Sequence, residues 1–411
     1  MRVLHVINSI EIGGAETFLL RLIQQQQQLG YSCAVLVLDE TNNDSTFLDY
    51  WKLKSGVAFV SKYKEAVDFK MRIIYKLDWV LRFFFGMSFL DTYKANLKKR
   101  YYQKLQHQFR FDIVNSHLLS SDLFVLRTLS KFIDIPWVIT SQGCYNDYSD
   151  VNIVSQLIKR INGLTYVAEK NLKIFKATAL PLPQNIKLIY NGLAMPDDKT
   201  VFKRRADLGL TDDDFVVGQI SRSIESKGME VSIKAVLKLV KSGYDNLKLL
   251  ITGPENEYYN MLRERYRHER HIIFTGVAIN PIEYVGLFDV GLLPTYFPSE
   301  SCPSSIIEYI SCGKPVIAFD NGEISNMLQS ESGAAGIVIS AVNEEGVPDY
   351  NVFADAIQVY MNDSTRLKHD SETALKAFEK FDIRNTALQY QEVYQHAIKH
   401  FSLSQSISDA A

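Results

Sequence analysis

The sequence predicts an α/β protein with two domains, each built on a parallel sheet that helices flank. Its 411 residues are long for one domain and comfortable for two. Short apolar runs recur along the chain, and many are followed by a glycine-containing turn and a helical pattern, which is typical of buried parallel strands in α/β folds. This alternating pattern is interrupted by a polar stretch near residues 193–212 and continues after it, so we expect a linker there.

The composition is that of an ordinary soluble globular protein, with 46% apolar and 22% charged residues. A net charge of −2 gives no indication of a nucleic-acid partner, and we expect none. The N-terminus lacks the features of a signal peptide, and no apolar run reaches about 18 residues, which favours a cytoplasmic location. The four cysteines are Cys33, Cys144, Cys302 and Cys312. Because no two of them form a C-x-x-C pair, a zinc site or disulfide framework is disfavoured and a reducing compartment is favoured.

The first domain begins with a buried strand at residues 2–8, a turn that contains Gly13 and Gly14, and a helix through Leu29. Glycines between a strand and a helix let the backbone approach a phosphate, and a simple tight turn is the alternative. The turn is not G-x-G-x-x-G, so a Rossmann dehydrogenase is disfavoured. We interpret the glutamine run at residues 24–28 as the solvated face of this helix.

Further strands of the first domain are predicted at residues 34–38, 57–60, 111–117, 137–140, 164–168 and 187–190. The third of these ends in His117, and the fourth leads into a loop that contains Gln142. Open α/β sheets bind ligands beyond the carboxyl ends of their strands, so we expect both side chains at the functional site.

Residues 62–110 carry roughly twelve Lys and Arg against four Asp and Glu, interleaved with aromatic residues. Two interpretations stay open. Basic amphipathic helices can rest on an anionic membrane surface, which would make the protein peripheral on the inner face of the cell membrane. Alternatively, the helices pack on the first sheet and expose a solvated basic face.

The second domain restarts the pattern with a strand at residues 216–220 and a helix after it. The loop between them holds Arg222 and Lys227, and two cations in such a loop can clamp a diphosphate. We interpret the acidic run at residues 212–214 as a cap for the preceding loop rather than a metal site. A last amphipathic helix is expected at about residues 385–400, with a frayed tail. The other predicted strands are 248–252, 272–275 and 288–293.

The stretch from residue 294 to residue 321 combines a loop, a helix and a strand. Ser304 is a good N-cap residue for the helix, Gly313 stands where a C′ glycine is common, and Pro315 stops the helix. The apolar run at residues 316–319 then predicts a buried parallel strand.

The chemistry of this stretch fits a nucleotide-sugar. The N–H groups of Ser304 and Ser305, together with the positive end of the helix dipole, form a site for a phosphate. Glu308, one turn into the helix, can bind the two hydroxyls of a ribose, and Glu300 would face the group beyond the phosphate. Two glutamates with seven residues between them also occur as solvated acids in ordinary helices.

With its flanking residues, the stretch resembles the E-x(7)-E signature of the retaining GT-B glycosyltransferases of family four, the glycosyl transferases group 1 of capsule and exopolysaccharide type. The run CGKPVIA at residues 312–318, the sequence GGAE at 13–16 and the pair Asn191-Gly192 also match this family. The resemblance extends over nearly the whole chain.

The resemblance implies two Rossmann-like domains that face one another across a cleft, with the boundaries 1–198 and 199–384. A helix at 385–411 would cross back to the first domain. The reaction would transfer a sugar from a nucleotide-sugar to a hydroxyl of a glycan or lipid-linked acceptor, with retention at the anomeric carbon. The donor would lie mainly on the second domain and the acceptor on the first.

The resemblance also implies roles for individual residues. Glu300 would bind hydroxyls of the donor sugar and Glu308 the ribose, while Gln142 and His117 complete the catalytic candidates. The groups that would bind the donor and stabilise its departing diphosphate are Gly13, Gly14, Arg222, Lys227, Ser304 and Ser305. Because these cations can replace a metal, neither a metal nor another cofactor is expected.

The sequence departs from the family at Gln142, where many relatives have a histidine directed at the donor sugar. A glutamine forms hydrogen bonds but does not titrate. Two accounts compete, a transferase in which Gln142 holds the sugar and a non-catalytic subunit that binds nucleotide-sugar or acceptor for a partner enzyme. A nucleotide-sugar epimerase on the same fold is a further alternative, which the paired glutamates and CGKPVIA disfavour.

Overall fold

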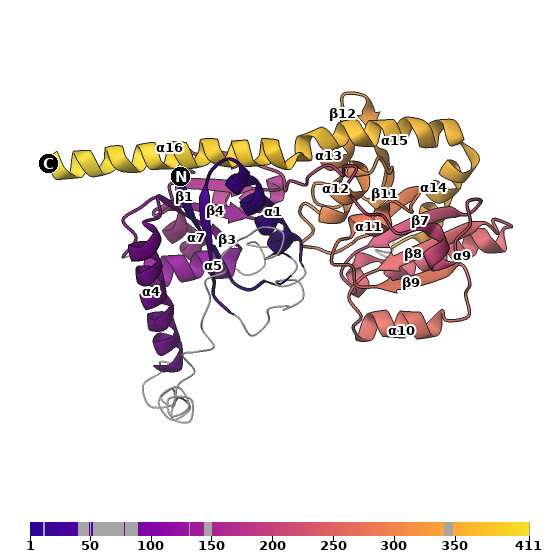
Figure 1. Ribbon diagram of the computed structural model, residues 1–411, viewed down its shortest axis with the longest axis horizontal. Helices are drawn as coiled ribbons and strands as arrows, with labels where there is room; N and C mark the ends of the chain where they lie inside the picture. Colours follow the sequence, from indigo (N-terminus) through magenta and orange to yellow (C-terminus); the bar gives the residue numbers. More distant parts are fainter. Residues whose placement is uncertain are drawn as a thin grey trace. The chain divides into compact units, whose positions relative to one another are not determined.

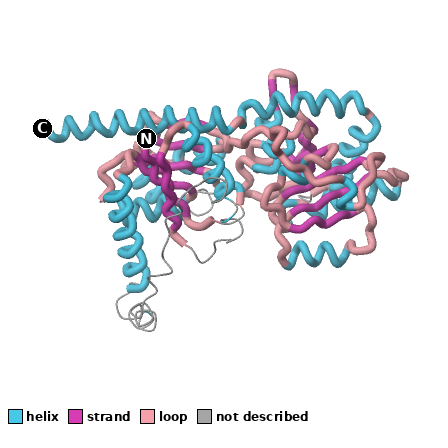
Figure 2. Tube along the Cα trace, in the orientation of Figure 1, coloured by secondary structure: helices cyan, strands magenta, loops and turns pink. Residues whose placement is uncertain are grey.

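The computed structural model describes residues 1–10, 13–39, 49, 51, 78, 89–130, 132–143, 150–340 and 348–410. The chain divides into two compact units, one of Met1–Ile189 with Thr386–Ala411 and one of Tyr190–Asn385. In each unit helices cover a sheet of parallel strands, as the ribbon in Figure 1 and the colouring by secondary structure in Figure 2 show.

The first unit contains a six-stranded sheet in the order β2-β1-β3-β4-β5-β6, and all its strand pairs are parallel. The strands are β1 (Arg2–Ile7), β2 (Ser32–Val37), β3 (Ile113–His117), β4 (Trp137–Ser141), β5 (Gly163–Tyr166) and β6 (Ile186–Leu188). These confirm the predicted strands within a few residues at each end, except for residues 57–60, which lie outside the described residues.

Two faces of this sheet are covered by different helices. Leu4 and Val114 belong to an apolar cluster with Tyr102 of α4 and with α7, whereas His5 contacts α1 on the opposite face. This follows from the alternation of side chains along a strand. The helices are α1 (Gly14–Gln28), α4 (Phe89–Phe109), α5 (Leu119–Phe124), α7 (Val151–Ile158), α8 (Lys173–Lys176) and α16 (Ile383–Ala410), with short helical turns at Val125–Leu129 and Glu169–Leu172.

The last helix, α16, buries two tyrosines against the first sheet. The hydroxyl of Tyr394 donates to Oδ1 of Asn115 at 2.7 Å, and that of Tyr390 lies 3.4 Å from Oγ1 of Thr140. The helix continues to Ala410, well beyond the expected end near residue 400 and through the expected frayed tail. No glycine or proline occurs in this part of the sequence to interrupt it.

The basic segment is only partly described. Residues 62–77 and 79–88 lie outside the described residues, and the remainder forms α4. Tyr102 and Leu105 of α4 are buried, while Arg100 and Lys104 are exposed. This part of the segment therefore packs on the first sheet and exposes basic side chains, and membrane contact by that face stays a prediction.

The second unit contains a six-stranded parallel sheet in the order β14-β11-β10-β7-β8-β9. In chain order this is 3-2-1-4-5-6, the strand order of dinucleotide-binding folds. The strands are β7 (Phe215–Ile220), β8 (Leu247–Thr252), β9 (Ile272–Gly276), β10 (Val290–Leu293), β11 (Val316–Phe319) and β14 (Gly336–Ile339), and a separate hairpin pairs β12 (Gln329–Ser330) with β13 (Gly333–Ala334). The helices are α9 (Met229–Lys241), α10 (Glu257–Arg265), α11 (Ile282–Val285), α12 (Ser304–Ser311), α13 (Ile324–Leu328), α14 (Tyr350–Asn362) and α15 (Ser364–Phe378), with short turns at Arg205–Leu208, Glu225–Lys227 and Glu379–Phe381.

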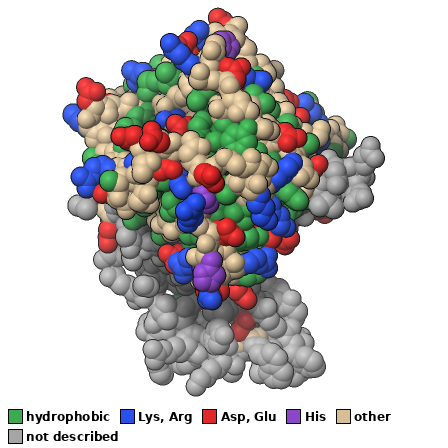
Figure 3. Space-filling model, turned by 90° about the vertical axis from the view of Figure 1, so that its right-hand side faces the viewer, with side chains coloured by type: hydrophobic (Ala, Val, Ile, Leu, Met, Phe, Trp, Pro, Cys, Tyr) green, Lys and Arg blue, Asp and Glu red, His purple; other side chains and the backbone are tan. Residues whose placement is uncertain are grey.

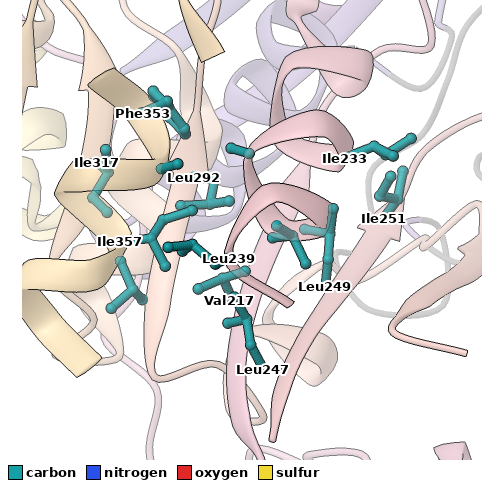
Figure 4. Packing of buried hydrophobic residues seen from close by; sticks show 14 of the residues in the cluster. Val217, Ile233, Leu239, Leu247, Leu249, Ile251, Leu292, Ile317, Phe353 and Ile357 are labelled. Carbon is teal, nitrogen blue, oxygen red and sulfur yellow. The ribbon is translucent and has the colours of Figure 1, made fainter. Parts of the chain in front are cut away.

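The core of the second unit lies where α9 and α14 pack on the sheet. Figure 4 shows Ile233 of α9 beside Ile251 of β8, Leu239 of α9 beside Val217 of β7, and Phe353 of α14 beside Ile317 of β11. Each of these is at most 3% exposed, and burying one such side chain contributes about 1.5–3 kcal/mol. This packing makes the second sheet a rigid support for the loops at its edge.

Basic and acidic side chains are interspersed on the face of the molecule shown in Figure 3. This agrees with the small net charge of the chain. Among the described residues, no helix is both long and apolar enough to span a membrane.

Candidate functional site

The strand order of the second sheet reverses between β7 and β10, which lie side by side. The loop after β7 leads to α9, and the loop after β10 leads to α12. Two loops that diverge from neighbouring strands in this way leave a crevice where open α/β sheets bind their ligands. Both loops contain residues that the sequence predicts to bind the donor.

The loop after β7 is fixed against the loop after β10 by its backbone. Gly228 has φ 73°, and a Cβ there would lie 2.1 Å from the carbonyl oxygen of Pro294, so a larger residue does not fit. The carbonyl oxygen of Lys227 accepts a hydrogen bond of 2.8 Å from Nε2 of Gln219. These contacts direct Lys227 toward the residues that follow β10.

Lys227 and Glu300 form a buried ion pair through Nζ and Oε2, with side chains that are 8% and 7% exposed. Oγ1 of Thr295 donates a second hydrogen bond of 2.8 Å to the same carboxylate oxygen. Burial lowers the pKa of the Lys227 ammonium, Glu300 opposes this change, and Arg222 adds to it. The sequence analysis predicts separate roles for the lysine and the glutamate, whereas the structure places them in direct contact.

Arg222 joins this cluster through an aromatic ring. Its guanidinium carbon lies 5.0 Å from the ring centroid of Phe297, and Nζ of Lys227 lies 5.3 Å from the same centroid. Both distances are within the range of cation–π attraction. Arg222 itself is exposed. Two cations and one carboxylate give the cluster a net positive charge, which suits an anionic ligand.

Helix α12 begins at Ser304 and continues the site. Pro303 occupies the N-cap position, and no side chain caps the helix, so the prediction of Ser304 as N-cap is wrong. The fixed φ of proline suits the entry to a helix, and the serine moves into the first turn. Within the helix, the N–H groups of Ser304 and Ser305 therefore have no acceptor. Glu308, one turn later, is buried.

The position of α12 is set by Tyr309. Its hydroxyl accepts a hydrogen bond of 2.6 Å from the N–H of Ile220 and lies 3.3 Å from the carbonyl oxygen of Leu292. A Cβ at Gly291 would lie 2.3 Å from the Tyr309 ring, so this close approach requires glycine. The predicted C-terminus is confirmed, because Gly313 follows the helix with φ 66°.

Several supporting residues escaped the sequence prediction. Nδ2 of Asn321 donates to the carbonyl oxygen of Phe297 at 2.8 Å, and Gly322, with φ 65°, passes close to the backbone of Glu300. Thr295 and Phe297 stand directly between β10 and the glutamate pair. Thr295 could have been recognised as a candidate site residue, because it is a polar residue that follows a buried strand.

The predicted residues of the first unit lie at the carboxyl edge of its sheet, around the strand reversal between β1 and β3. Gly13 is the N-cap of α1 with an extended backbone, and Gly14 is the first helical residue. A carboxylate oxygen of Glu16 lies 2.3 Å from the position of a Cβ at Gly13, so an acid already faces this helix end. Gln142 directly follows β4 and is half-buried.

His117, the last residue of β3, is fully buried. Its Nε2 is 3.0 Å from Nδ1 of His5, and Nε2 of His5 is 2.9 Å from Oε1 of Gln26. Gln26 is also fully buried, so the interpretation of the glutamine run as a solvated face is wrong for this residue, whereas Gln28 is exposed. Leu118, the next residue, has φ 69° and ψ 152°, a conformation that costs a non-glycine residue about 1–3 kcal/mol.

The structure thus groups the predicted residues into two sets. The set in the second unit is Arg222, Lys227, Glu300, Ser304, Ser305 and Glu308, and the set in the first unit is Gly13, Gly14, His117 and Gln142. Among the described residues, no three His, Cys, Asp or Glu side chains are grouped so as to hold a metal ion. Asp214 instead accepts a hydrogen bond of 2.7 Å from the N–H of Thr211, as the capping interpretation expects.

Comparison with solved structures identifies this architecture as the GT-B fold. The Anabaena protein Alr3699/HepE in complex with UDP superimposes with a TM-score of 0.69 and 16% identity, and the match covers 96% of this chain and 100% of that chain. A sucrose-phosphate synthase from Thermosynechococcus elongatus gives a TM-score of 0.70 at 14% identity, covering 97% and 99%. At these identities the likeness shows the fold alone.

Comparison of sequences adds a family. Residues 214–363, within the second unit, match the family model described as glycosyl transferases group 1. The lipopolysaccharide core biosynthesis mannosyltransferase LpsB of Rhizobium meliloti (strain 1021) is 26% identical over 211 residues. That match covers 50% of this chain and 57% of the relative, so it spans only about half the length of each protein.

Proposed function

We propose that this protein is a retaining glycosyltransferase that moves a sugar from a nucleotide-sugar to a hydroxyl of a glycan or lipid-linked acceptor. The observation that carries the proposal is the cluster at the strand reversal of the second sheet. There Lys227 pairs with Glu300, Arg222 shares Phe297 with Lys227, and the uncapped start of α12 follows. The bound UDP of Alr3699/HepE and the mannosyltransferase name of LpsB support the same class of donor and acceptor.

The chemistry follows from where charge develops. As the glycosidic bond to the diphosphate breaks, negative charge grows on the phosphate oxygens and the sugar becomes oxocarbenium-like. Arg222, Lys227 and the N–H groups of Ser304 and Ser305 would stabilise that negative charge, and interactions of this kind lower the barrier because they strengthen as the charge forms. These groups can do so without a metal ion. Glu300 would accept hydrogen bonds from donor-sugar hydroxyls, and Glu308 from the ribose.

A second candidate is a non-catalytic subunit that binds the nucleotide-sugar. Gln142, where many relatives have histidine, favours it, since a glutamine cannot titrate or carry positive charge. We prefer the transferase because the other groups that would bind the donor and stabilise its diphosphate, including Arg222, Lys227 and Glu308, are all present. Gln142→Ala should then lower turnover far more than donor affinity.

Donor binding and turnover test the proposal together. Arg222→Ala and Glu308→Ala should each weaken nucleotide-sugar binding about ten- to hundredfold, because a charge-assisted hydrogen bond contributes about 1.5–3 kcal/mol. Asp213→Ala is the matched control, since this exposed acid lies in the loop before β7 and should leave binding unchanged. Thermal shift with uridine and guanosine sugar-diphosphates measures binding. If both variants bind the nucleotide-sugar as tightly as the parent protein, the proposed donor site is wrong. If the protein binds the nucleotide-sugar tightly but releases no nucleotide with any acceptor or lipid extract, it is not a transferase.

A further inference from the structure

Three buried polar side chains in the first unit form a hydrogen-bonded row that ends at His117. His5 belongs to β1 and Gln26 to α1, and each bond of the row is 3.0 Å or shorter. Each of the three residues is fully buried. Burying polar side chains costs free energy unless all of their polar atoms form hydrogen bonds. A buried row of three such residues is therefore expected to have a function.

Both imidazoles of the row are neutral. Burial lowers the pKa of His5 to about 4, and burial together with the neighbouring His5 lowers the pKa of His117 well below its usual value. A neutral imidazole has one nitrogen that donates a hydrogen bond and one that accepts. Each bond in the row therefore determines which nitrogen of the next ring carries the proton.

Gln26 gives the row its direction. Its carbonyl oxygen can only accept, so Nε2 of His5 carries the hydrogen of the 2.9 Å bond. The thiol of Cys33, whose pKa burial raises to about 12, stays protonated and donates to the same oxygen at 3.4 Å. Nδ1 of His5 then has no proton, and its lone pair accepts a hydrogen bond from Nε2–H of His117.

Each end of the row has one buried atom without a hydrogen-bond partner among the described residues, Nε2 of Gln26 at one end and Nδ1 of His117 at the other. With its proton on Nε2, the ring presents a lone pair at Nδ1, and this buried atom has no hydrogen-bond partner among the residues that the structure describes. His117 ends β3 at the strand reversal of the first sheet, the edge where open α/β sheets bind ligands. A buried acceptor without a donor is costly, which favours a ligand that supplies one.

We propose that His5 and Gln26 are positioning residues that hold His117 in its Nε2–H form, so that Nδ1 accepts a hydrogen bond from a hydroxyl of the substrate. An acceptor at this point fits a sugar or acceptor alcohol, and it repels the oxygens of a phosphate. The identity of the hydroxyl rests on the proposed glycosyl transfer, whereas the tautomer of His117 does not.

The tautomer can be measured without any substrate. Protein labelled with ¹⁵N only at its eight histidines gives two-bond ¹H–¹⁵N correlations that distinguish Nδ1–H, Nε2–H and doubly protonated rings. Loss of one set of signals in His117→Asn assigns His117. At pH 7 we expect the Nε2–H form in the parent protein and a mixture of both neutral forms in Gln26→Leu. Gln28→Leu makes the same chemical change at the exposed end of α1 and should leave the Nε2–H form intact.

Two spectra would overturn the proposal. An Nδ1–H or charged His117 in the parent protein would mean that the amide of Gln26 donates rather than accepts, or that the row does not set the tautomer. An unchanged Nε2–H form in Gln26→Leu would remove the role of Gln26. Dispersed amide signals in each variant, compared with the parent, show whether the substitution has left the fold intact.

Turnover tests the hydroxyl. Gln26→Leu should lower kcat about two- to tenfold, the effect of one neutral hydrogen bond, without changing donor affinity, and Gln28→Leu should change neither. Full kcat in a Gln26→Leu protein whose tautomer has changed would refute the role of His117 Nδ1. If the parent protein itself never turns over, the proposed transferase fails, and the spectra still decide the tautomer.

Discussion

The buried pair of Lys227 and Glu300 allows a double-mutant cycle that tests its contribution to the second unit. Glu300→Gln removes the negative charge and leaves the ammonium beside Arg222 around one phenyl ring. Lys227→Met removes the positive charge and leaves a carboxylate that still accepts from Thr295. Breaking a buried ion pair by removing one partner typically costs about 3–5 kcal/mol, since an uncompensated buried charge remains.

The neighbours predict an order for the two single variants. Glu300→Gln should be the more destabilising, because two cations then lack a counterion, whereas Lys227→Met leaves one anion with Arg222 and Thr295 nearby. The double variant should lose less stability than the sum of the two single variants, by about 1–3 kcal/mol, since neither buried charge remains. Asp213→Ala, in an exposed acid of the same unit, should change stability by less than about 0.5 kcal/mol.

The assay must report on the second unit. All three tryptophans, at positions 51, 79 and 137, precede it in the sequence, so their fluorescence follows the first unit instead. Hydrogen exchange of peptides from β7 and β10 measures the free energy of opening where the pair lies. Additive single costs, each below about 1 kcal/mol, would refute the reasoning, and equal loss of tryptophan signal in every variant would show that the effect is not confined to the second unit.

Three further predictions concern pH, metal and membrane. The pKa of His5 is about 4 in the folded protein and about 6.5 when unfolded, so the unfolded state binds more protons between these values and stability should fall by about 3 kcal/mol as the pH falls through this range. His5→Gln should make the unfolding midpoint depend less on pH, whereas the control Val3→Ala should lower the midpoint by a similar amount at every pH. If His5→Gln and the parent protein show the same dependence on pH, the effect does not come from His5. If Arg222 and Lys227 take the place of a metal ion, transfer activity should survive EDTA. Complete loss of activity that magnesium or manganese restores would count against this proposal. If α4 rests on a membrane, anionic liposomes should float more of the protein than neutral liposomes at low salt. Replacing Arg100 and Lys104 with Glu should then weaken the binding free energy by about 1 kcal/mol for each positive charge removed. Equal recovery on both types of vesicle would exclude an electrostatic attachment.

Much of the fold was predictable because its determinants are local. The apolar run at residues 316–319 and the glycine that follows α12 each act within one or two turns of chain, and both predictions are confirmed. The pair Arg222 and Lys227 in the loop after β7 was also recognisable, since a strand followed by a helix fixes where such a loop lies. The E-x(7)-E spacing likewise predicted a loop at Glu300 and a helix at Glu308, which are the loop after β10 and α12.

Tertiary structure alone decided which of these groups meet. Lys227 and Glu300 are 73 residues apart in sequence, and His5 and His117 are 112 apart. Their contacts depend on β7 lying next to β10 and on β1 lying next to β3, and strand order is not encoded in the hydrophobic pattern of any single strand. Gln26 shows the same limit, because a glutamine among four others has no local feature that marks it as buried. It is buried because α1 packs on the face of the sheet where His5 needs a hydrogen-bond partner.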